Sequence, residues 1–199
     1  MQTPITVTII RDEHRALGAM LRSIPLLLAE HRRHGSLPDF KSLRAMLFYV
    51  DEFPERLHHP KESQLLFPKL RALAPELREC LDELEQDHAR GERAIRELQH
   101  SLLAFEMMGE ARRARFEQQV DRYVELYLRH MAREENELLP VAQRVFSAED
   151  WVDLNEAFAS NRDPLTGHTP DEAYQALFQQ VLRSVPAPVG LGPALGSGR

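Results

Sequence analysis

The sequence predicts an all-α fold, an antiparallel up-down-up-down four-helix bundle with one or two extra C-terminal helices. Apolar residues recur at steps of three and four, which places them on one face of a helix, and no segment alternates as a strand does. With 199 residues, the chain can bury a core without disulfides. We expect a bundle over residues 1–145, a helical extension over 146–185 and a disordered, Pro- and Gly-rich tail over 186–199.

The first helix is expected from Thr6 to His34, with Gly35 as its stop. Its inward face carries His14 where the spacing calls for an apolar residue. That face reads Ile10, His14, Leu17, Leu21, Ile24 and Leu28.

The second helix is expected from Pro38 to Leu66, with Leu43, Leu47 and Val50 facing inward. Pro54 and Pro60 predict a kink or local irregularity, because proline removes a backbone donor and clashes with the preceding turn. We expect Phe67-Pro68 to mark its end.

The third helix should open at Pro75 and the fourth near Glu110. Polar residues again interrupt the apolar faces, His88 in the third helix, and His130 with Glu134 in the fourth. Those faces read Leu77, Leu81, Leu84, His88, Gly91, Ile95, Leu98 and Leu102, and then Phe116, Val120, Tyr123, Tyr127, His130, Glu134 and Leu138.

Beyond the bundle, the run from Ser147 to Asp150 predicts the cap of a short helix ending near Ala159. Residues Asn161 to Pro170 should form a loop, and Asp171 to Val185 a last amphipathic helix.

Charge and composition exclude several classes of protein. A net charge of −6 argues against nucleic acid as a partner, and the short arginine runs Arg32-Arg33 and Arg112 to Arg115 are interpreted as solvated helix faces. The single cysteine, Cys80, excludes an internal disulfide and is interpreted as a packing residue. No apolar run approaches the roughly 20 residues of a membrane span, and no signal peptide is evident, so we expect a cytoplasmic protein.

The chain also repeats a motif. His58-x3-Glu62-x3-Leu-Phe-Pro recurs 72 residues later as His130-x3-Glu134-x3-Leu-Leu-Pro. An acidic residue and a histidine precede each copy, Glu13-His14 by 44 residues and Asp87-His88 by 42, counted from histidine to histidine. The sequence therefore predicts two related helical hairpins.

The repeated residue types suit metal binding. Residues four apart share one face of a helix, so each motif can aim an imidazole and a carboxylate at one point. Imidazole binds iron, zinc, copper and nickel, and a carboxylate can bridge two cations. The candidate ligands are His14, His58, Glu62, His88, His130 and Glu134, with the two glutamates bridging two metals around a solvent oxo or hydroxo group. The alternative is a structural His–Glu network without metal, but burying this many unpaired charges is costly.

Other residues are weaker candidates. Glu92, one turn after His88, could be a seventh ligand or a hydrogen-bond partner of an imidazole. His59 should point about 100° away from His58 on a helix, beside the site or at the surface. Tyr123 and Tyr127 are expected to pack in the core, with a hydrogen bond to metal-bound oxygen as the alternative. We expect the other histidines outside the site: His31, His34, His100 and His168.

From Ile10 to Pro140, these motifs resemble the hemerythrin-like, HHE cation-binding family. The segment from Ser147 to Pro164 also resembles bacterial members with a C-terminal extension. The resemblance implies a bundle holding two non-haem irons on the six candidate ligands. In the oxygen-carrying hemerythrins a histidine stands at the position of Glu92, and an aspartate five residues after the fourth-helix histidine replaces Glu134. This carboxylate-richer set favours higher iron oxidation states and departs from reversible oxygen carriage.

Three functions follow as hypotheses. The first is a protein that binds or senses dioxygen, peroxide, nitric oxide or iron. The second is a di-iron oxidase, peroxidase or iron-centre repair factor, and the third is a metal-buffering or structural bundle. A ferritin-like site is disfavoured, because its Glu-x2-His pattern, here Glu55–His58 and Glu85–His88, falls on the second and third helices instead of the second and fourth. The sequence leaves open whether the protein is an enzyme.

Overall fold

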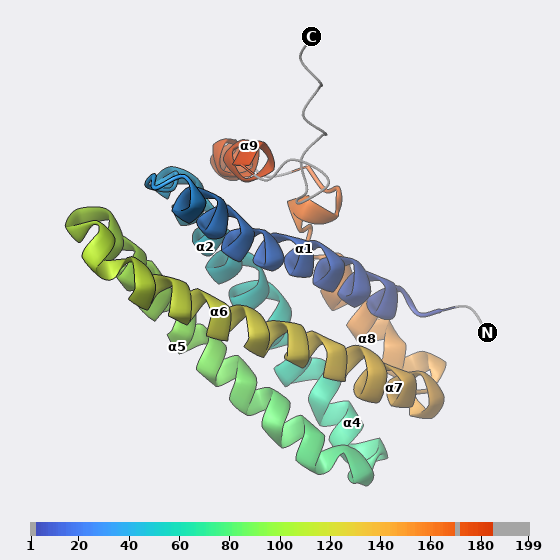
Figure 1. The fold of residues 1–199 in the computed structure, drawn as a ribbon. Coiled ribbons are helices and arrows are strands. Elements are labelled where there is room, and N and C mark those ends of the chain that lie inside the picture. Colours follow the sequence, from blue (N-terminus) through green and yellow to red (C-terminus); the bar gives the residue numbers. More distant parts are fainter. Residues whose placement is uncertain (1–2, 170–171, 185–199) are drawn as a thin grey trace.

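The computed structural model describes residues 3–169 and 172–184, and this part of the chain contains helices and no strand. The predicted all-α class is therefore confirmed. The long helices are α1 (Ile5–Arg33), α2 (Phe40–Val50), α5 (Arg78–Met108) and α6 (Glu110–Arg133). In Figure 1, α6 lies between α1 and α5 and packs against both, and α2 packs against α5. Gly109, with φ +66°, makes the tight turn that returns the chain from α5 to α6.

The second predicted helix is broken, as its prolines indicated. After α2 come a π-helical segment η1 (Asp51–His58), one turn α3 (His59–Lys61), a second π-helical segment η2 (Glu62–Leu66) and α4 (Phe67–Leu73). The prediction that the helix ends at Phe67-Pro68 was wrong. Proline cannot donate to the carbonyl one turn earlier, and a wider turn just before it absorbs the misfit while the chain continues as α4.

The second hairpin also has a π-helical segment just before a proline. The π-helical segment η4 (Glu134–Leu138) follows α6 directly, and α7 (Leu139–Val145) carries Pro140 in its first turn. In both copies a main-chain hydrogen bond spans five residues, from Phe67 to Glu62 and from Leu139 to Glu134. The sequence repeat is thus also a repeat of local backbone structure.

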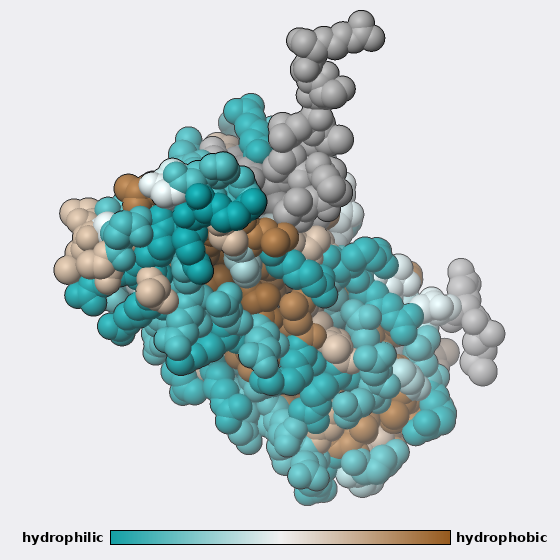
Figure 2. Space-filling view, viewed as in Figure 1, coloured by the Kyte–Doolittle hydropathy of each residue, from teal (hydrophilic) through white to brown (hydrophobic). Residues whose placement is uncertain are grey.

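Apolar burial is divided between two clusters. One fills the space between α1, α2, α5 and α6 around Leu21, Leu47 and Phe116. The other joins the start of α1 to α4, α7 and α8 (Ala148–Ala159), around Phe67 and Leu138. Figure 2 shows a largely hydrophilic face in which apolar groups are visible in the seam between helices.

The C-terminal extension packs along α1 and α2. Helix α8 begins with the predicted capping box between Ser147 and Asp150 and contacts α1. After it come two single turns, η5 (Pro164–Thr166) and η6 (Glu172–Tyr174), and helix α9 (Gln175–Ser184), which contacts α2. The predicted helix over 171–185 is thus confirmed for its described part, and the predicted tail over 186–199 lies outside the described residues.

One predicted surface residue is buried. Arg113 is only 6 % exposed, and its guanidinium donates to Glu110 and to the backbone carbonyl of Ser36. The prediction of a wholly solvated arginine face was wrong at this position, because the loop after α1 closes over the side chain. Among the described residues, no helix is both long and apolar enough to cross a lipid bilayer.

Candidate metal centre

All six residues predicted as metal ligands gather in one buried layer. Three α-helices and three π-helical segments supply them, and each of the six residues is at most 8 % exposed. They are His14 on α1, His58 on η1, Glu62 on η2, His88 on α5, His130 on α6 and Glu134 on η4. The chain therefore brings together residues separated by up to 120 positions in the sequence.

Glu62 lies between two histidines. Its Oε1 is 3.0 Å from Nε2 of His58, and its Oε2 is 3.4 Å from Nε2 of His88. The two oxygens of one carboxylate thus face imidazoles from different hairpins.

Glu134 repeats this arrangement from the other hairpin. Its Oε1 is 3.2 Å from Nε2 of His130, and its Oε2 is 3.3 Å from Nε2 of His14. Within the second hairpin, Nε2 of His88 and Nε2 of His130 are 3.1 Å apart. The sequence repeat has become an approximate twofold arrangement, with each glutamate spanning both halves.

The acidic residue before each lone histidine faces the motif histidine of its own hairpin. Nδ1–H of His58 donates to Oε2 of Glu13 over 2.6 Å. At the equivalent place, Nδ1 of His130 is 3.8 Å from Oδ2 of Asp87, an ion-pair separation longer than a hydrogen bond. These carboxylates fix the ring orientation that directs both Nε2 atoms inward.

The residue after each glutamate contacts the lone histidine of the other hairpin. Oε1 of Glu135 is 3.1 Å from Nδ1 of His14, and Oγ of Ser63 is 2.9 Å from Nδ1 of His88. Nδ1 is hydrogen-bonded on the rings of His14, His58 and His88 and faces Asp87 on the ring of His130, so Nε2 is the nitrogen presented to the centre.

Charge interactions in the layer shift pKa values strongly. Burial alone would lower the pKa of His58, but Glu62 and Glu13 raise it well above its ordinary value. Burial opposes the ionisation of Glu62, yet the His58 charge and hydrogen bonds from His58 and His88 hold its pKa well below the usual range. For His130, Glu134 and Asp87 overcome burial and raise the pKa to about 10. A cation entering here would displace protons from these imidazoles.

The imidazole nitrogens and carboxylate oxygens of this layer are arranged to bind a cation and do not fully hydrogen-bond to one another. Several buried atoms have no hydrogen-bond partner within the described chain, although they lie close to one another: Nε2 of His58, Nδ1 of His130 and both oxygens of Glu62 and Glu134. An unsatisfied buried polar group costs about 1–3 kcal/mol, and more if charged. Ligands at about 2.1 Å from one transition-metal ion and at right angles lie about 3 Å apart, close to the separations in this layer.

The structure places next to the layer a further histidine, which the helical spacing had predicted beside the site or at the surface. His59 is 5 % exposed, stacks on His88 with ring centres 4.3 Å apart, and has a ring nitrogen within 4.8 Å of ligand atoms of Glu62, His88 and His130. The surface alternative was wrong because it assumed a regular α-helix, whereas the chain changes from π- to α-helix between His58 and His59; the other alternative, a position beside the site, agrees with the burial of His59. The two flanking prolines were the available signal.

Glu92, predicted as a possible seventh ligand or a partner of a ligand imidazole, is exposed and pairs with Arg96 instead. His100 and His168 are exposed as predicted, and Cys80 is buried in the apolar cluster next to α8.

The predicted core tyrosines surround a further buried acid. Tyr123 and Tyr127 both donate to Oε1 of Glu55, whose other oxygen is 3.1 Å from Nδ1 of His59. Burial raises the pKa of Glu55 to about 7, against the hydrogen bonds from the tyrosines. Residue 91 must be glycine for the Tyr127 ring to fit, because a Cβ at this position would lie 1.8 Å from the tyrosine hydroxyl oxygen.

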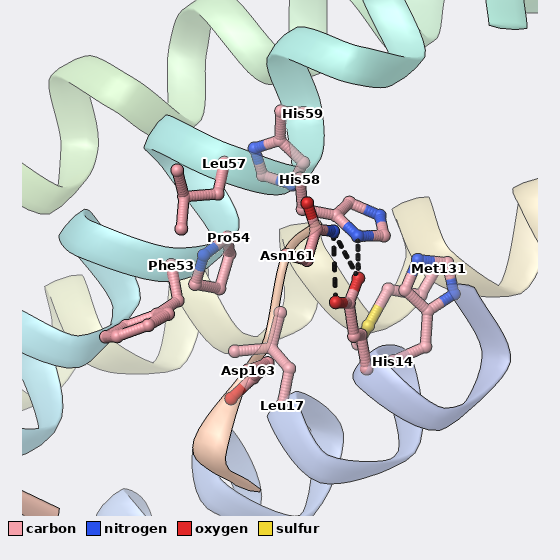
Figure 3. Close-up of a pocket in the computed structure, with 11 residues that line it drawn as sticks. His14, Leu17, Phe53, Pro54, Leu57, His58, His59, Met131, Asn161 and Asp163 are labelled. Atoms are coloured by element: carbon pink, nitrogen blue, oxygen red, sulfur yellow. Dashed lines mark hydrogen bonds and ion pairs between the residues drawn. The ribbon is translucent and has the colours of Figure 1, made fainter. Parts of the chain in front are cut away.

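A small cavity adjoins the His14 and His58 side of the layer. It offers about 20 Å³ for the centre of a water-sized molecule, enough for one such molecule. Figure 3 shows the two histidines on one side, with Leu17 and Met131 among the apolar lining and Asn161 beside His58. The His88 and His130 rings do not line this cavity.

Comparison with known proteins agrees with this geometry. The family model "Hemerythrin HHE cation binding domain" matches residues 6–142, more than half of the chain and the whole segment that supplies the six residues. Searches of curated proteins and of solved structures found no match. The match and the buried His–Glu layer lead to one conclusion: the chain belongs to the hemerythrin HHE cation-binding family.

Proposed function

We propose that this protein is a non-haem di-iron protein that binds or senses a small ligand such as dioxygen, peroxide or nitric oxide. One observation carries the proposal. Glu62 and Glu134 each direct one oxygen to the His14–His58 half and the other to the His88–His130 half. A carboxylate placed in this way can bridge two cations.

Each half then has its own ligand set. One cation would be held by His14 and His58, and the other by His88 and His130, with both glutamates shared. We add His59 as a ligand on the second side, because its ring nitrogen belongs to the cluster formed by Glu62, His88 and His130. The first half, with fewer histidines, faces the cavity.

When bound, the irons would supply redox capacity and an open coordination position for a small ligand. The chain's own residues orient the rings through their Nδ1 partners, and the apolar walls formed by Leu17, Leu57 and Met131 limit water near His14 and His58. Nδ1 engagement and a largely apolar surround are the usual protein controls over a metal centre.

The cavity beside His14 and His58 suits a small ligand. It has space for about one water-sized molecule, as a diatomic gas or peroxide requires. A di-iron oxidase or peroxidase, an iron-centre repair factor and a metal buffer are the alternatives that share the same ligands.

The proposal includes the architecture and location expected from the sequence. The contacts of α6 with α1 and α5, and of α2 with α5, support an up-down-up-down bundle over residues 1–145. Residues 146–185 are proposed as its helical extension, and the cytoplasm as its location.

The test is metal content per chain after expression with iron, together with absorption spectra before and after anaerobic reduction and exposure to air. We expect two irons per chain and the charge-transfer absorption of a di-iron centre. His130→Ala should lower the iron content well below two, whereas His100→Ala, which changes an exposed histidine, should leave it unchanged. A single tightly held zinc, or equal iron in both variants, would overturn the assignment. Stable adducts with dioxygen or nitric oxide would favour binding, and rapid bleaching with product would favour the oxidase.

A further inference from the structure

Asn161 connects the C-terminal extension to the candidate centre. It follows α8, outside the 6–142 segment matched by the family model, yet it is only 6 % exposed and lines the cavity next to His58. We propose that Asn161 is a positioning residue: it holds Glu13 against Nδ1 of His58 and thereby orients that imidazole. The consequence for cation binding rests on the proposed function, whereas the positioning itself does not.

The contacts form a continuous chain. Nδ2 of Asn161 is 3.0 Å from each oxygen of Glu13, and Oε2 of Glu13 accepts Nδ1–H of His58 over 2.6 Å. In Figure 3, dashed lines join the labelled Asn161 and His58 to the carboxylate between them. All three residues are at most 7 % exposed, so water offers little competition for the hydrogen bonds.

Asn161 is itself held in place. Its Oδ1 accepts from Nζ of Lys61, and its backbone N–H donates to the carbonyl of Phe158 over 3.0 Å. Two residues later, Asp163 accepts the hydroxyl of Tyr49 over 2.6 Å. The amide therefore approaches Glu13 from a segment fixed on both sides, as a positioning group requires.

The other hairpin provides an internal comparison. Asp87 occupies the place of Glu13 but is only partly buried, and it accepts a long hydrogen bond of 3.4 Å from Nη1 of Arg90. No buried amide contacts Asp87 in the described part of the chain, and its carboxylate stays 3.8 Å from His130. The half with the asparagine thus has the close carboxylate–imidazole contact, and the half without it does not.

The decisive variant is Asn161→Asp, which keeps the side-chain volume and an acceptor for Lys61 but removes the donor to Glu13. Asn161→Ala removes both interactions. Asn155→Ala is the matched control, because Asn155 is another asparagine of the extension bonded to α1, through Thr6, and it does not contact Glu13. Melting of the metal-free proteins verifies that each variant folds.

Two measurements report on different parts of the inference. In metal-free protein with ¹⁵N-labelled histidine, NMR should detect the Nδ1–H proton of His58, shifted downfield by Glu13 and slow to exchange. We expect Asn161→Asp and Asn161→Ala to shift it and speed its exchange, and Asn155→Ala to leave it as in the wild type. Titration with Co²⁺ should show one of the two ions bound about 10-fold more weakly in the Asn161 variants, the lower end of the effect of such supporting residues.

A further variant tests the route through Glu13. In a Glu13→Ala background, Asn161→Ala should cause no additional loss of Co²⁺ affinity. An unchanged His58 Nδ1–H signal in Asn161→Asp would overturn the inference, whether or not cobalt binds. Failure of wild-type protein to bind Co²⁺ or iron would instead count against the proposed function, while the metal-free NMR comparison still decides the role of Asn161.

Discussion

Gly91 is the position where a single methyl group should disturb the candidate site most from outside it. A Cβ there would lie 1.8 Å from the hydroxyl oxygen of Tyr127, 2.6 Å from its Cζ and 3.0 Å from Oε1 of Glu55. The tyrosine ring is held on the other side by stacking on His59. Gly91→Ala therefore requires the ring to move and its hydrogen bond to Glu55 to break.

The contacts set the size of the effect. Overpacking a buried site costs about 1–3 kcal/mol, and losing a hydrogen bond to a charged group costs about 1.5–3 kcal/mol. Replacing glycine by alanine inside a helix stabilises the helix by about 1 kcal/mol, which offsets part of this cost. The net destabilisation should be about 1.5–5 kcal/mol, which lowers the melting temperature by very roughly 3–20 °C in a chain of this size.

The assay is urea and thermal unfolding of the metal-free protein in the presence of a chelator, so that metal affinity does not enter. Gly18→Ala is the matched control, since Gly18 is also inside a helix but the atoms nearest a Cβ there are Nη1 of the flexible Arg22 at 3.1 Å and side-chain carbons at 3.7 Å. We expect Gly18→Ala to be neutral or stabilising by up to about 1 kcal/mol. In a Tyr127→Leu background, Gly91→Ala should lose most of its cost.

The reasoning would be refuted if Gly91→Ala were as stable as Gly18→Ala. It would also be refuted if the cost persisted unchanged after Tyr127→Leu, because the clash would then lie elsewhere.

The remaining predictions concern the ligand set and the pH dependence of stability. His59→Ala should weaken binding of one Co²⁺ ion by at least about 10-fold. In a parallel titration, Glu92→Ala should bind Co²⁺ as the wild type does. A loss of affinity in Glu92→Ala but not in His59→Ala would identify Glu92, and not His59, as the ligand. Burial raises the pKa of Asp163 to about 6 against the hydrogen bond from Tyr49. Because the folded state holds this proton more tightly than the unfolded state, its contribution to stability should fall by up to about 3 kcal/mol as pH rises from about 4 to 6. Asp163→Asn should remove that fall in urea unfolding at a series of pH values, and parallel curves for the two proteins would contradict it.

Local regularities in the sequence predicted most of the candidate centre. A histidine in an apolar helical face is visible from periodicity alone, as is a glutamate four residues later. The repeat of the motif, with its preceding acidic residue, predicted that two hairpins contribute equivalent sets. These features depend on spacing along one helix, and a helix preserves spacing.

Helical periodicity could not predict the surroundings of His59 and Arg113. His59 enters the cluster because the chain changes from π- to α-helix beside it, and periodicity assumes one constant helix. Arg113 was expected in solvent, but the loop after α1 covers it, and no pattern within α6 could show that.

The sequence by itself determined the helical class, the repeat and the six residues of the buried layer, because amphipathic periodicity and residue chemistry are properties of short segments. Tertiary structure alone decided that Glu62 and Glu134 each span both halves, that Gly91 makes room for Tyr127, and that Asn161 reaches Glu13 from 148 residues away. These relations depend on how separate helices pack, and packing is set by contacts between distant residues that no local pattern records.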